Sequence, residues 1–239
     1  MRVLLTRSRD DSVELAQRLS AKGHETLISP VIEIVPLDEI SLPEYCTATI
    51  ATSRHALENI ALQHRKILQK MLRGNPLYLV GNRTEATARA LGFDQICCAA
   101  KDAASLATLI LSDHPQGVLL YLAGRQRKRD LEDRLRAGGL KVETVEVYDA
   151  RACLALEAET VVALRAGRLD AVMHFSRRSA KLFTELAAMA GLAPQAGRLR
   201  HICISPDAAL GLSGFEAHNI VLASEPDLPS MLAALEAAP

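Results

Sequence analysis

Short apolar runs alternate along this chain with longer stretches in which apolar residues recur every three or four positions. The runs predict β-strands and the longer stretches predict helices. The predicted strands are Val3–Thr6, Glu25–Ser29, Ala48–Thr52, Leu77–Val80, Gln95–Cys98, Val118–Leu122, Val142–Val147, Ala171–Phe175, His201–Ile204 and Asn219–Leu222. The predicted helices are Ser12–Ala21, Ala56–Leu72, Thr84–Leu91, Ser105–Leu111, Lys128–Ala137, Leu156–Ala166, Arg178–Ala190 and Leu228–Ala237. Alternating strands and helices are typical of βαβ units, so we predict an α/β fold with parallel sheets.

The pattern occurs twice. The strand–helix–strand unit that begins at Val3 returns, roughly transposed, at Val118. Two further pairs of segments match: Thr49–Arg54 with Ala171–Arg177, and Leu79–Thr84 with Cys203–Ala208. We therefore expect two copies of one module that face each other across a ligand-binding cleft.

Two stretches predict connections between the modules, Pro30–Pro43 and Tyr148–Ala155. If both are crossings, the chain begins in one domain, builds the second and returns to finish the first. The domains are then 1–36 plus 150–239, and 38–147. Each has five strands, which is a flavodoxin-like count. A tandem division near Gln116 is the alternative, and the pattern leaves it open.

Composition excludes several classes of protein. The 239 residues are 49% hydrophobic and 23% charged, with 28 basic and 28 acidic side chains. Because the formal charge is zero, no overall field attracts nucleic acid or an anionic membrane. With aromatics at 3% and no tryptophan, stacking platforms for bases are not expected. No run is long enough for a signal peptide or a membrane span, so we predict a cytoplasmic protein.

The cysteines and histidines predict neither disulfides nor a metal site. The five cysteines are Cys46, Cys97, Cys98, Cys153 and Cys203, an odd number without metal-type spacing, and we expect buried, reduced thiols. The seven histidines are scattered, and we expect His174 and His201 to be packed or half-exposed within strands. Phosphate-binding loops, dinucleotide-binding turns and nucleophile elbows are absent.

Small hydroxyl residues, glycine and arginine gather after the predicted strands, where parallel sheets bind ligands. The segments are Thr6–Arg9, Thr52–Arg54, Gly81–Thr84, Ala123–Arg125, Ser176–Arg178 and Ser205–Asp207. We expect each to precede a helix, whose amino end attracts anions, and arginine adds planar donors for carboxylates. For any single segment, helix capping is the favoured explanation, and recurrence at five or six strand ends makes anion binding an equal alternative. For the basic run Arg125–Arg129, a solvated helix start and a bound anion both stay open.

Taken in order, these segments resemble the uroporphyrinogen-III synthase family. The resemblance rests on Val3–Arg7, Ala51–Ala56, Leu79–Thr84, Leu131–Gly139, Val145–Tyr148 and Phe175–Ser176, and it covers nearly the whole chain. It implies two similar flavodoxin-like domains with an interleaved chain, joined by a two-stranded linker. It also implies a monomeric enzyme without cofactor or metal, in transient contact with hydroxymethylbilane synthase.

The substrate that the resemblance implies is hydroxymethylbilane, a linear tetrapyrrole with eight carboxylates. Loss of water gives an azafulvene, the terminal ring D attacks through its substituted carbon, and a spiro intermediate recloses with that ring inverted. Closure without the enzyme gives the uninverted isomer. The alternatives are a two-domain protein that binds an anion without chemistry, and a degenerate synthase-like domain with a regulatory role.

The family pattern places site residues at numbered positions of this chain. Tyr148 is the implied helper for departure of the hydroxyl, since a phenol is protonated at neutral pH. The implied substrate-binding residues are Arg7, Thr52, Ser53, Gly81, Asn82, Thr84, Gly124 and Ser176. The strand-end arginines Arg54, Arg125 and Arg177 are further candidates for substrate binding, and Arg177 stands where the family usually has proline. The segment Ser205–Ala208 departs from the pattern. Asp207 there repels a carboxylate unless a cation pairs with it, and Arg177 is the candidate cation.

Overall fold

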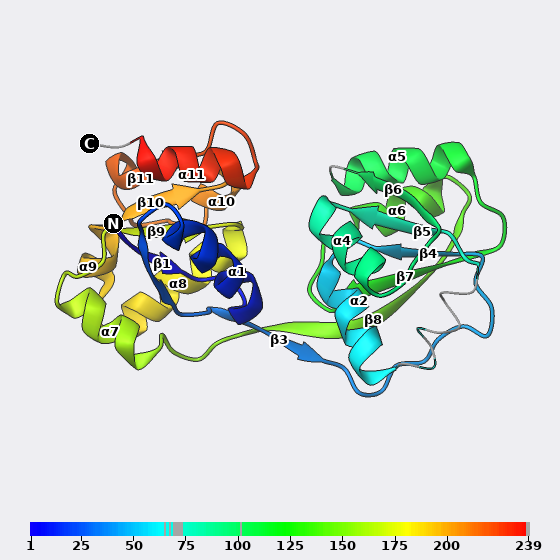
Figure 1. Ribbon diagram of the computed structural model, residues 1–239, viewed down its shortest axis with the longest axis horizontal. Coiled ribbons are helices and arrows are strands. Elements are labelled where there is room, and N and C mark those ends of the chain that lie inside the picture. Colours follow the sequence, from blue (N-terminus) through cyan, green and yellow to red (C-terminus); the bar gives the residue numbers. More distant parts are fainter. Residues whose placement is uncertain (65, 67, 69–73, 101, 238–239) are drawn as a thin grey trace. The chain divides into compact units, whose positions relative to one another are not determined.

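The computed structural model describes residues 1–64, 66, 68, 74–100 and 102–237. Its strands are β1 (Arg2–Leu5), β2 (Glu25–Ile28), β3 (Ile32–Pro36), β4 (Ala48–Ala51), β5 (Leu77–Val80), β6 (Ile96–Ala100), β7 (Val118–Gly124), β8 (Lys141–Ala152), β9 (Ala171–His174), β10 (Arg200–Cys203) and β11 (Ile220–Leu222). Its helices are α1 (Arg9–Ser20), α2 (Arg54–Gln63), α4 (Asn82–Ala90), α5 (Ala103–Asp113), α6 (Asp130–Ala137), α7 (Ala158–Arg165), α8 (Arg177–Met189), α9 (Ala193–Gly197), α10 (Pro206–Ala209) and α11 (Leu228–Glu236), with a short 3₁₀ turn at Ala217–Asn219. The predicted α/β fold is confirmed (Figure 1).

The chain forms two compact units. Unit 1 comprises Met1–Glu33 and Arg151–Pro239, and unit 2 comprises Ile34–Ala150. Both unit boundaries fall inside strands, one in β3 and the other in β8.

Unit 1 holds a five-stranded sheet in the order β11-β10-β9-β1-β2, and each adjacent pair is parallel. Leu4, Val172 and Phe183 belong to the core on the face covered by α7, α8 and α9. On the opposite face, Leu5 and Met173 pack against α1 and α11. Apolar side chains on both faces explain why these strands have few polar positions.

Unit 2 holds a six-stranded sheet in the order β3-β8-β7-β4-β5-β6. One face, with Ile50 and Tyr121, packs against α5 and α6, and the other, with Leu79 and Leu122, packs against α2 and α4. The pairs from β8 through β6 are parallel. A parallel sheet between two helix layers places the carboxyl ends of its strands at one edge, where the predicted site segments begin.

The sequence repeat explains the two strand orders. The repeat matches β1 with β7, β9 with β4, and β10 with β5, and β2 and β11 then correspond to β8 and β6. With these equivalences, β11-β10-β9-β1-β2 and β6-β5-β4-β7-β8 are the same spatial order. The strand–helix–strand portion comes first along the chain in unit 1 and last in unit 2. The units therefore share one sheet arrangement with circularly permuted connections.

One strand was not predicted. The segments Pro30–Pro43 and Tyr148–Ala155, which were predicted as connections and contain the two unit boundaries, also contain β3 and the end of β8. These strands are neighbours: Leu37 N donates to Val147 O at 3.2 Å, and Cys153 N donates to Val31 O at 3.0 Å. Proline is compatible with β3 because this strand lies at the sheet edge.

The helix predictions need three corrections. The helix expected from Lys128 begins at Asp130, so Gly124 and Arg125 do not immediately precede it. The helix expected at Ala56–Leu72 begins at Arg54 as α2, and part of its second half lies outside the described residues. The short helices α9 and α10 were not predicted, since four or five residues give little periodic signal.

Candidate functional site

Tyr148 lies near the end of β8, paired in register with Gly124 of β7. Its half-buried side chain packs against the core shared by β4, β7 and α2. The imidazole of His55 meets the phenol ring edge-on, with 6.0 Å between ring centroids. Tyr148 is therefore held by packing on its ring while it stands at the carboxyl edge of the sheet.

Gly124 leaves the space that the Tyr148 ring occupies. A Cβ atom at Gly124 would lie 2.6 Å from Cζ and 2.8 Å from the phenol oxygen. Such distances are far shorter than any ordinary contact, so a side chain here displaces the ring. The sequence singled out both residues, and the structure places them in direct contact.

Ser53 connects the start of α2 to this phenol. Its Oγ accepts a hydrogen bond from His55 N at 3.3 Å, which caps the helix, and its side chain also bonds Tyr148. Burial raises the pKa of the Tyr148 phenol, and the Ser53 bond offsets part of that rise. Because its pKa is raised from a value near 10, the phenol is protonated at neutral pH.

Thr52 bonds a second phenol. Its Oγ1 lies 2.9 Å from the hydroxyl of Tyr121, a side chain that is almost completely buried. Burial raises the pKa of Tyr121 as well. Two consecutive residues at the end of β4 thus each contact a tyrosine hydroxyl.

Arg54 and Arg125 are engaged with carboxylates. Arg54 Nη1 lies 3.0 Å from Glu58 Oε1, and the second oxygen of Glu58 lies 3.1 Å from His55 Nδ1. Arg125 is half-exposed and lies 3.3 Å from Glu146 Oε2. Each guanidinium is thus held in place by a carboxylate of its own unit.

The α4 amino end differs from that of α2 because no side chain caps it. Gly81 is the N-cap residue and has φ +82°, a conformation that glycine adopts readily. Asn82 is exposed and Thr84 is buried in the first turn. The first amides of a helix have no intrahelical acceptor, so this uncapped end can bind an anion.

In unit 1 the predicted residues lie on three strand ends. Arg7 follows β1, with Nη2 2.8 Å from Asp11 Oδ2 and its guanidinium carbon 4.5 Å from the centre of the Phe175 ring. Ser176 caps α8 by accepting a hydrogen bond from Ser179 N at 3.1 Å. Helix capping is thus confirmed as one role of Ser176 and of Ser53.

Asp207 is paired with a cation. Arg177 Nη2 lies 2.6 Å from Asp207 Oδ1, and both side chains are more than half exposed. The sequence named Arg177 as the candidate partner, and the structure confirms this contact. The departure from the family pattern at Asp207 is therefore neutralised within unit 1.

His174 and His201 are completely buried in unit 1 and contact each other. His174 Nε2 lies 3.0 Å from His201 Nδ1, and His201 Nε2 lies 3.1 Å from the carbonyl oxygen of Ala196. Since the carbonyl accepts from Nε2–H of a neutral His201, His174 Nε2–H donates to His201 Nδ1. Burial lowers the pKa of His201 to about 4 and also lowers that of His174. The prediction of packed histidines is confirmed.

The cysteine prediction was partly wrong. Cys203 is buried, but Cys97 is exposed because β6 is the last strand of its sheet. Cys46 and Cys153 are partly buried, and all four are free thiols. Among the described residues, no group of three histidine, cysteine or acidic side chains could hold a metal ion.

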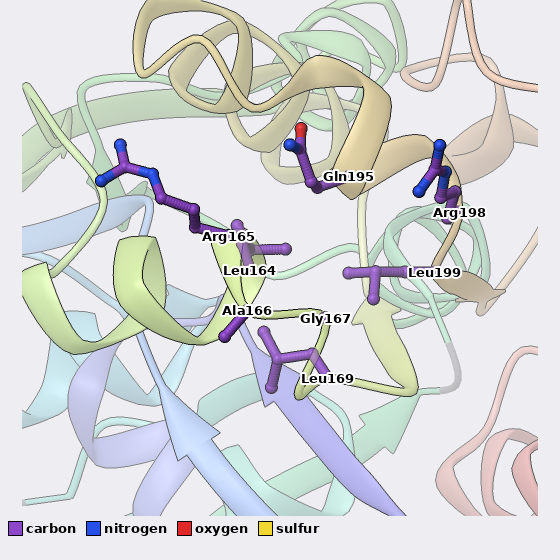
Figure 2. Close-up of a pocket in the computed structure, with 8 residues that line it drawn as sticks. All are labelled: Leu164, Arg165, Ala166, Gly167, Leu169, Gln195, Arg198 and Leu199. Carbon is purple, nitrogen blue, oxygen red and sulfur yellow. The ribbon is translucent and has the colours of Figure 1, made fainter.

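Two hollows in unit 1 contain none of the predicted site residues. One, of about 430 Å³, lies between the end of α7 and α9 and is lined by Leu164, Gln195 and Leu199 among others (Figure 2). The other, of about 500 Å³, lies beside Phe215. Arg198 borders both.

Sequence reasoning missed three contacts of the unit 2 site. Tyr121 belongs to an apolar strand, where an aromatic residue indicates core. His55 carried no ligand-type spacing. Arg127 was noted only as part of a basic run, yet it donates to the carbonyl oxygen of Gly124 at 3.1 Å. The signal that could have indicated this contact is the position of Arg127 three residues after Gly124, at the end of a strand.

Comparison with known proteins agrees with these observations. The family described as uroporphyrinogen-III synthase HemD matches residues 13–233. The uroporphyrinogen-III synthetase of Helicobacter pylori 26695 is similar over 100% of both chains, with a TM-score of 0.67 and 19% identity. A mutant uroporphyrinogen III synthase of the extremely thermophilic bacterium Thermus thermophilus is similar over 99% of this chain and 97% of its own, with a TM-score of 0.57 and 18% identity. At these identities the structures support the fold, and the match to the family over most of the sequence supports the activity. The chain belongs to the uroporphyrinogen-III synthase family and is an enzyme of tetrapyrrole biosynthesis, a cyclising hydro-lyase.

Proposed function

We propose that this chain closes hydroxymethylbilane with inversion of ring D, and that Tyr148 assists the first step. The observation that carries the proposal is a protonated phenol fixed at a strand end between Gly124 and Ser53. Its proton is donated to the departing hydroxyl, so the carbon–oxygen bond breaks and water leaves. The bilane becomes a cationic azafulvene, which is the electrophile for ring closure.

The steps that follow need geometry more than acid–base groups. The substituted carbon of ring D attacks the electrophilic carbon and forms the spiro intermediate. This intermediate fragments, the ring turns and recloses through its other carbon, and loss of a proton restores the aromatic pyrrole. Because a flexible chain closes wrongly without help, orientation supplies a large part of the effect.

Backbone amides and hydroxyls are the main proposed carboxylate ligands. The uncapped start of α4, with Gly81 and Asn82, offers free amides in unit 2, and Thr52 offers a hydroxyl. Arg7, Arg54 and Arg177 have carboxylate partners within the protein, and we propose that their positive charge adds long-range attraction for the substrate carboxylates. Thr84, Arg125 and Ser176 complete the proposed set.

The proposal extends to the wider organisation of the chain. We propose two flavodoxin-like domains, 1–36 plus 150–239 and 38–147, with β3 and β8 as the two-stranded linker. The order β2-β1-β9-β10-β11 is the flavodoxin order 2-1-3-4-5. Among the described residues, no helix has the length and hydrophobicity needed to span a membrane. We propose a cytoplasmic monomer that meets hydroxymethylbilane synthase transiently.

The test uses purified protein and hydroxymethylbilane generated enzymatically in the same vessel. Separation of the product isomers should show predominantly the inverted isomer. Formation of the uninverted isomer alone, at the rate seen without protein, would contradict the proposal. Tight product binding without turnover would favour the non-catalytic alternative.

A further inference from the structure

Arg127 is not a solvated member of its basic run. Its side chain is 14% exposed and its fork meets both oxygens of Glu132, with Nε–Oε2 and Nη2–Oε1 each 3.1 Å. Glu132 is almost completely buried and also accepts a hydrogen bond from the Thr144 hydroxyl at 2.6 Å. The arginine lies 3.0 Å from Glu146 as well. Arg127, from the segment before α6, and Glu132, from α6, therefore form a buried two-bond ion pair, and β8 contributes further partners to both.

A buried ion pair is a weak source of stability. The loss of hydration of both charges offsets their attraction, and apolar residues of similar size often replace such a pair without destabilising the fold. We therefore look for the role of the pair in the neighbouring group that it holds in place. The remaining bond of Arg127 runs from Nη1 to the carbonyl oxygen of Gly124.

That bond fixes a peptide group beside Tyr148. The carbonyl of Gly124 accepts from Arg127, and the next amide, Arg125 N, donates to the carbonyl oxygen of Tyr148 at 2.9 Å. The peptide is held on both sides, and its glycine lies against the phenol ring. A rotation of this peptide changes the surface that the ring rests on.

The same ion pair lies close to the second phenol. The pKa of Tyr121 is raised first by burial, and the Glu132 carboxylate raises it while the Arg127 guanidinium lowers it. Tyr121 bonds Thr52, a proposed carboxylate ligand. The Arg127–Glu132 pair thus contacts Gly124, which lies against Tyr148, and it also lies near Tyr121, which bonds Thr52.

We propose that the Arg127–Glu132 pair is a positioning device for the cyclisation, which holds the Gly124–Arg125 peptide and thereby sets the orientation of Tyr148. This rests on the proposed role of Tyr148. Neither side chain touches substrate, and the pair acts through Gly124. Its loss changes turnover more than binding, because the proposed carboxylate ligands at the start of α4 and in unit 1 do not depend on this peptide.

The test replaces the pair by apolar residues. In the double variant Arg127→Met, Glu132→Leu the fold is retained, as the melting temperature and circular dichroism show. The expected kcat falls on the order of 10²-fold, the size expected when a reacting group is misplaced by about 1 Å. The KM changes little, and the inverted share of the product falls because spontaneous closure competes. The matched control Tyr78→Phe removes the 3.0 Å bond to Asp113 from another buried side chain of unit 2 and leaves kcat unchanged.

Two further variants keep the inference falsifiable. Arg127→Lys keeps a charge beside Glu132 but loses the fork, so kcat still falls. Adding Arg127→Met to Gly124→Ala reduces kcat little further, since both act through one ring position. Wild-type kcat and isomer ratio in a folded double variant, or in Arg127→Lys, would overturn the inference. If the wild-type protein makes no inverted isomer, the proposed function itself fails, which is a different result.

Discussion

The strand ends of the two units share one backbone plan and carry different side chains. Ser53 and Ser176 stand at equivalent positions, and each caps the following helix. In unit 2 the residue before the serine is Thr52, which bonds Tyr121, and Ser53 itself bonds Tyr148. In unit 1 the residue before the serine is Phe175, which packs against Arg7. Both copies therefore present a capping serine and paired arginines, but only the copy in unit 2 places phenols beside them.

The interiors of the two copies differ at equivalent positions too. Strand register matches His174 and His201 of unit 1 with Ala51 and Leu77 of unit 2. All four side chains are completely buried. The scaffold thus accepts either a hydrogen-bonded imidazole pair or an apolar pair. We therefore expect acid to act on this place in unit 1 and not on its equivalent in unit 2.

The largest expected effect is the loss of turnover in Tyr148→Phe, a change at a strand end of unit 2. Tyr148→Phe removes the acid of unit 2, and turnover should fall about 10²-fold, the lower range for general acid catalysis. The fold is retained because the ring still fills its site. Steady-state kinetics and thermal melts measure both. Tyr78→Phe is the control, a buried phenol of the same unit away from the strand ends, and an equal loss there would remove Tyr148 from its special role.

Acid should destabilise unit 1 before unit 2. The pKa of His201 is about 4 in the folded state and near 6.5 when unfolded, so protons bind the unfolded state preferentially as pH falls below 6.5. Stability is complete above that pH and is lost toward 4. From His201 alone the loss by about pH 5 is roughly 2 kcal/mol, at 1.36 kcal/mol per pKa unit.

Hydrogen exchange of β9 and β10, compared with β4 and β5, measures this acid effect. The amides of β9 and β10 should lose protection between about pH 7.5 and pH 5, after correction for the intrinsic rate. Equal changes in both sheets would contradict the assignment to the histidine pair.

The matched serines should separate capping from chemistry. Ser53→Ala and Ser176→Ala should each destabilise the protein by about 1 kcal/mol through loss of a helix cap. Only Ser53→Ala should also lower kcat, by about tenfold, because a hydrogen bond to Tyr148 is lost. Urea titration and steady-state kinetics give both values. A similar fall in kcat for Ser176→Ala would show that the two strand ends act alike.

The smallest effect concerns the exposed pair in unit 1. Arg177→Gln should raise KM about two- to fivefold, and Asp207→Asn should lower it by a similar factor, since exposed pairs contribute up to about 1 kcal/mol. The kcat of both variants should stay unchanged. Shifts of KM in the same direction for both would mean that Arg177 does not bind substrate carboxylates.

The pattern of apolar residues predicted the central strands of both sheets, but it missed the edge strand β3 and the short helix α10. All ten predicted strands have counterparts, because apolar runs between turns are a local property. The strand β3 was missed, since the two prolines around it indicate a connection and its partner is more than a hundred residues away. Helix α10 was missed because its four residues are positioned by the Ser205 cap and not by periodicity.

The site was predictable only in part for a similar reason. Tyr148 and Gly124 came from the family resemblance, and their contact is a consequence of the register between β7 and β8. Arg127 pairs with Glu132 in the next helix and Glu146 in the next strand, so its role depends on three elements. The position of Arg127 close after Gly124 indicates a contact with that glycine, but the basic run gives no local sign of the pairing with the two glutamates.

The central claim is that the Tyr148 phenol assists departure of the hydroxyl group. The most direct measurement compares Tyr148→Phe with wild type on hydroxymethylbilane and on an analogue whose leaving group, such as acetate, departs without a proton. The account predicts a defect of about 10²-fold with the natural substrate and little or none with the analogue. An equal defect with both substrates would show that Tyr148 serves another step and would contradict the account.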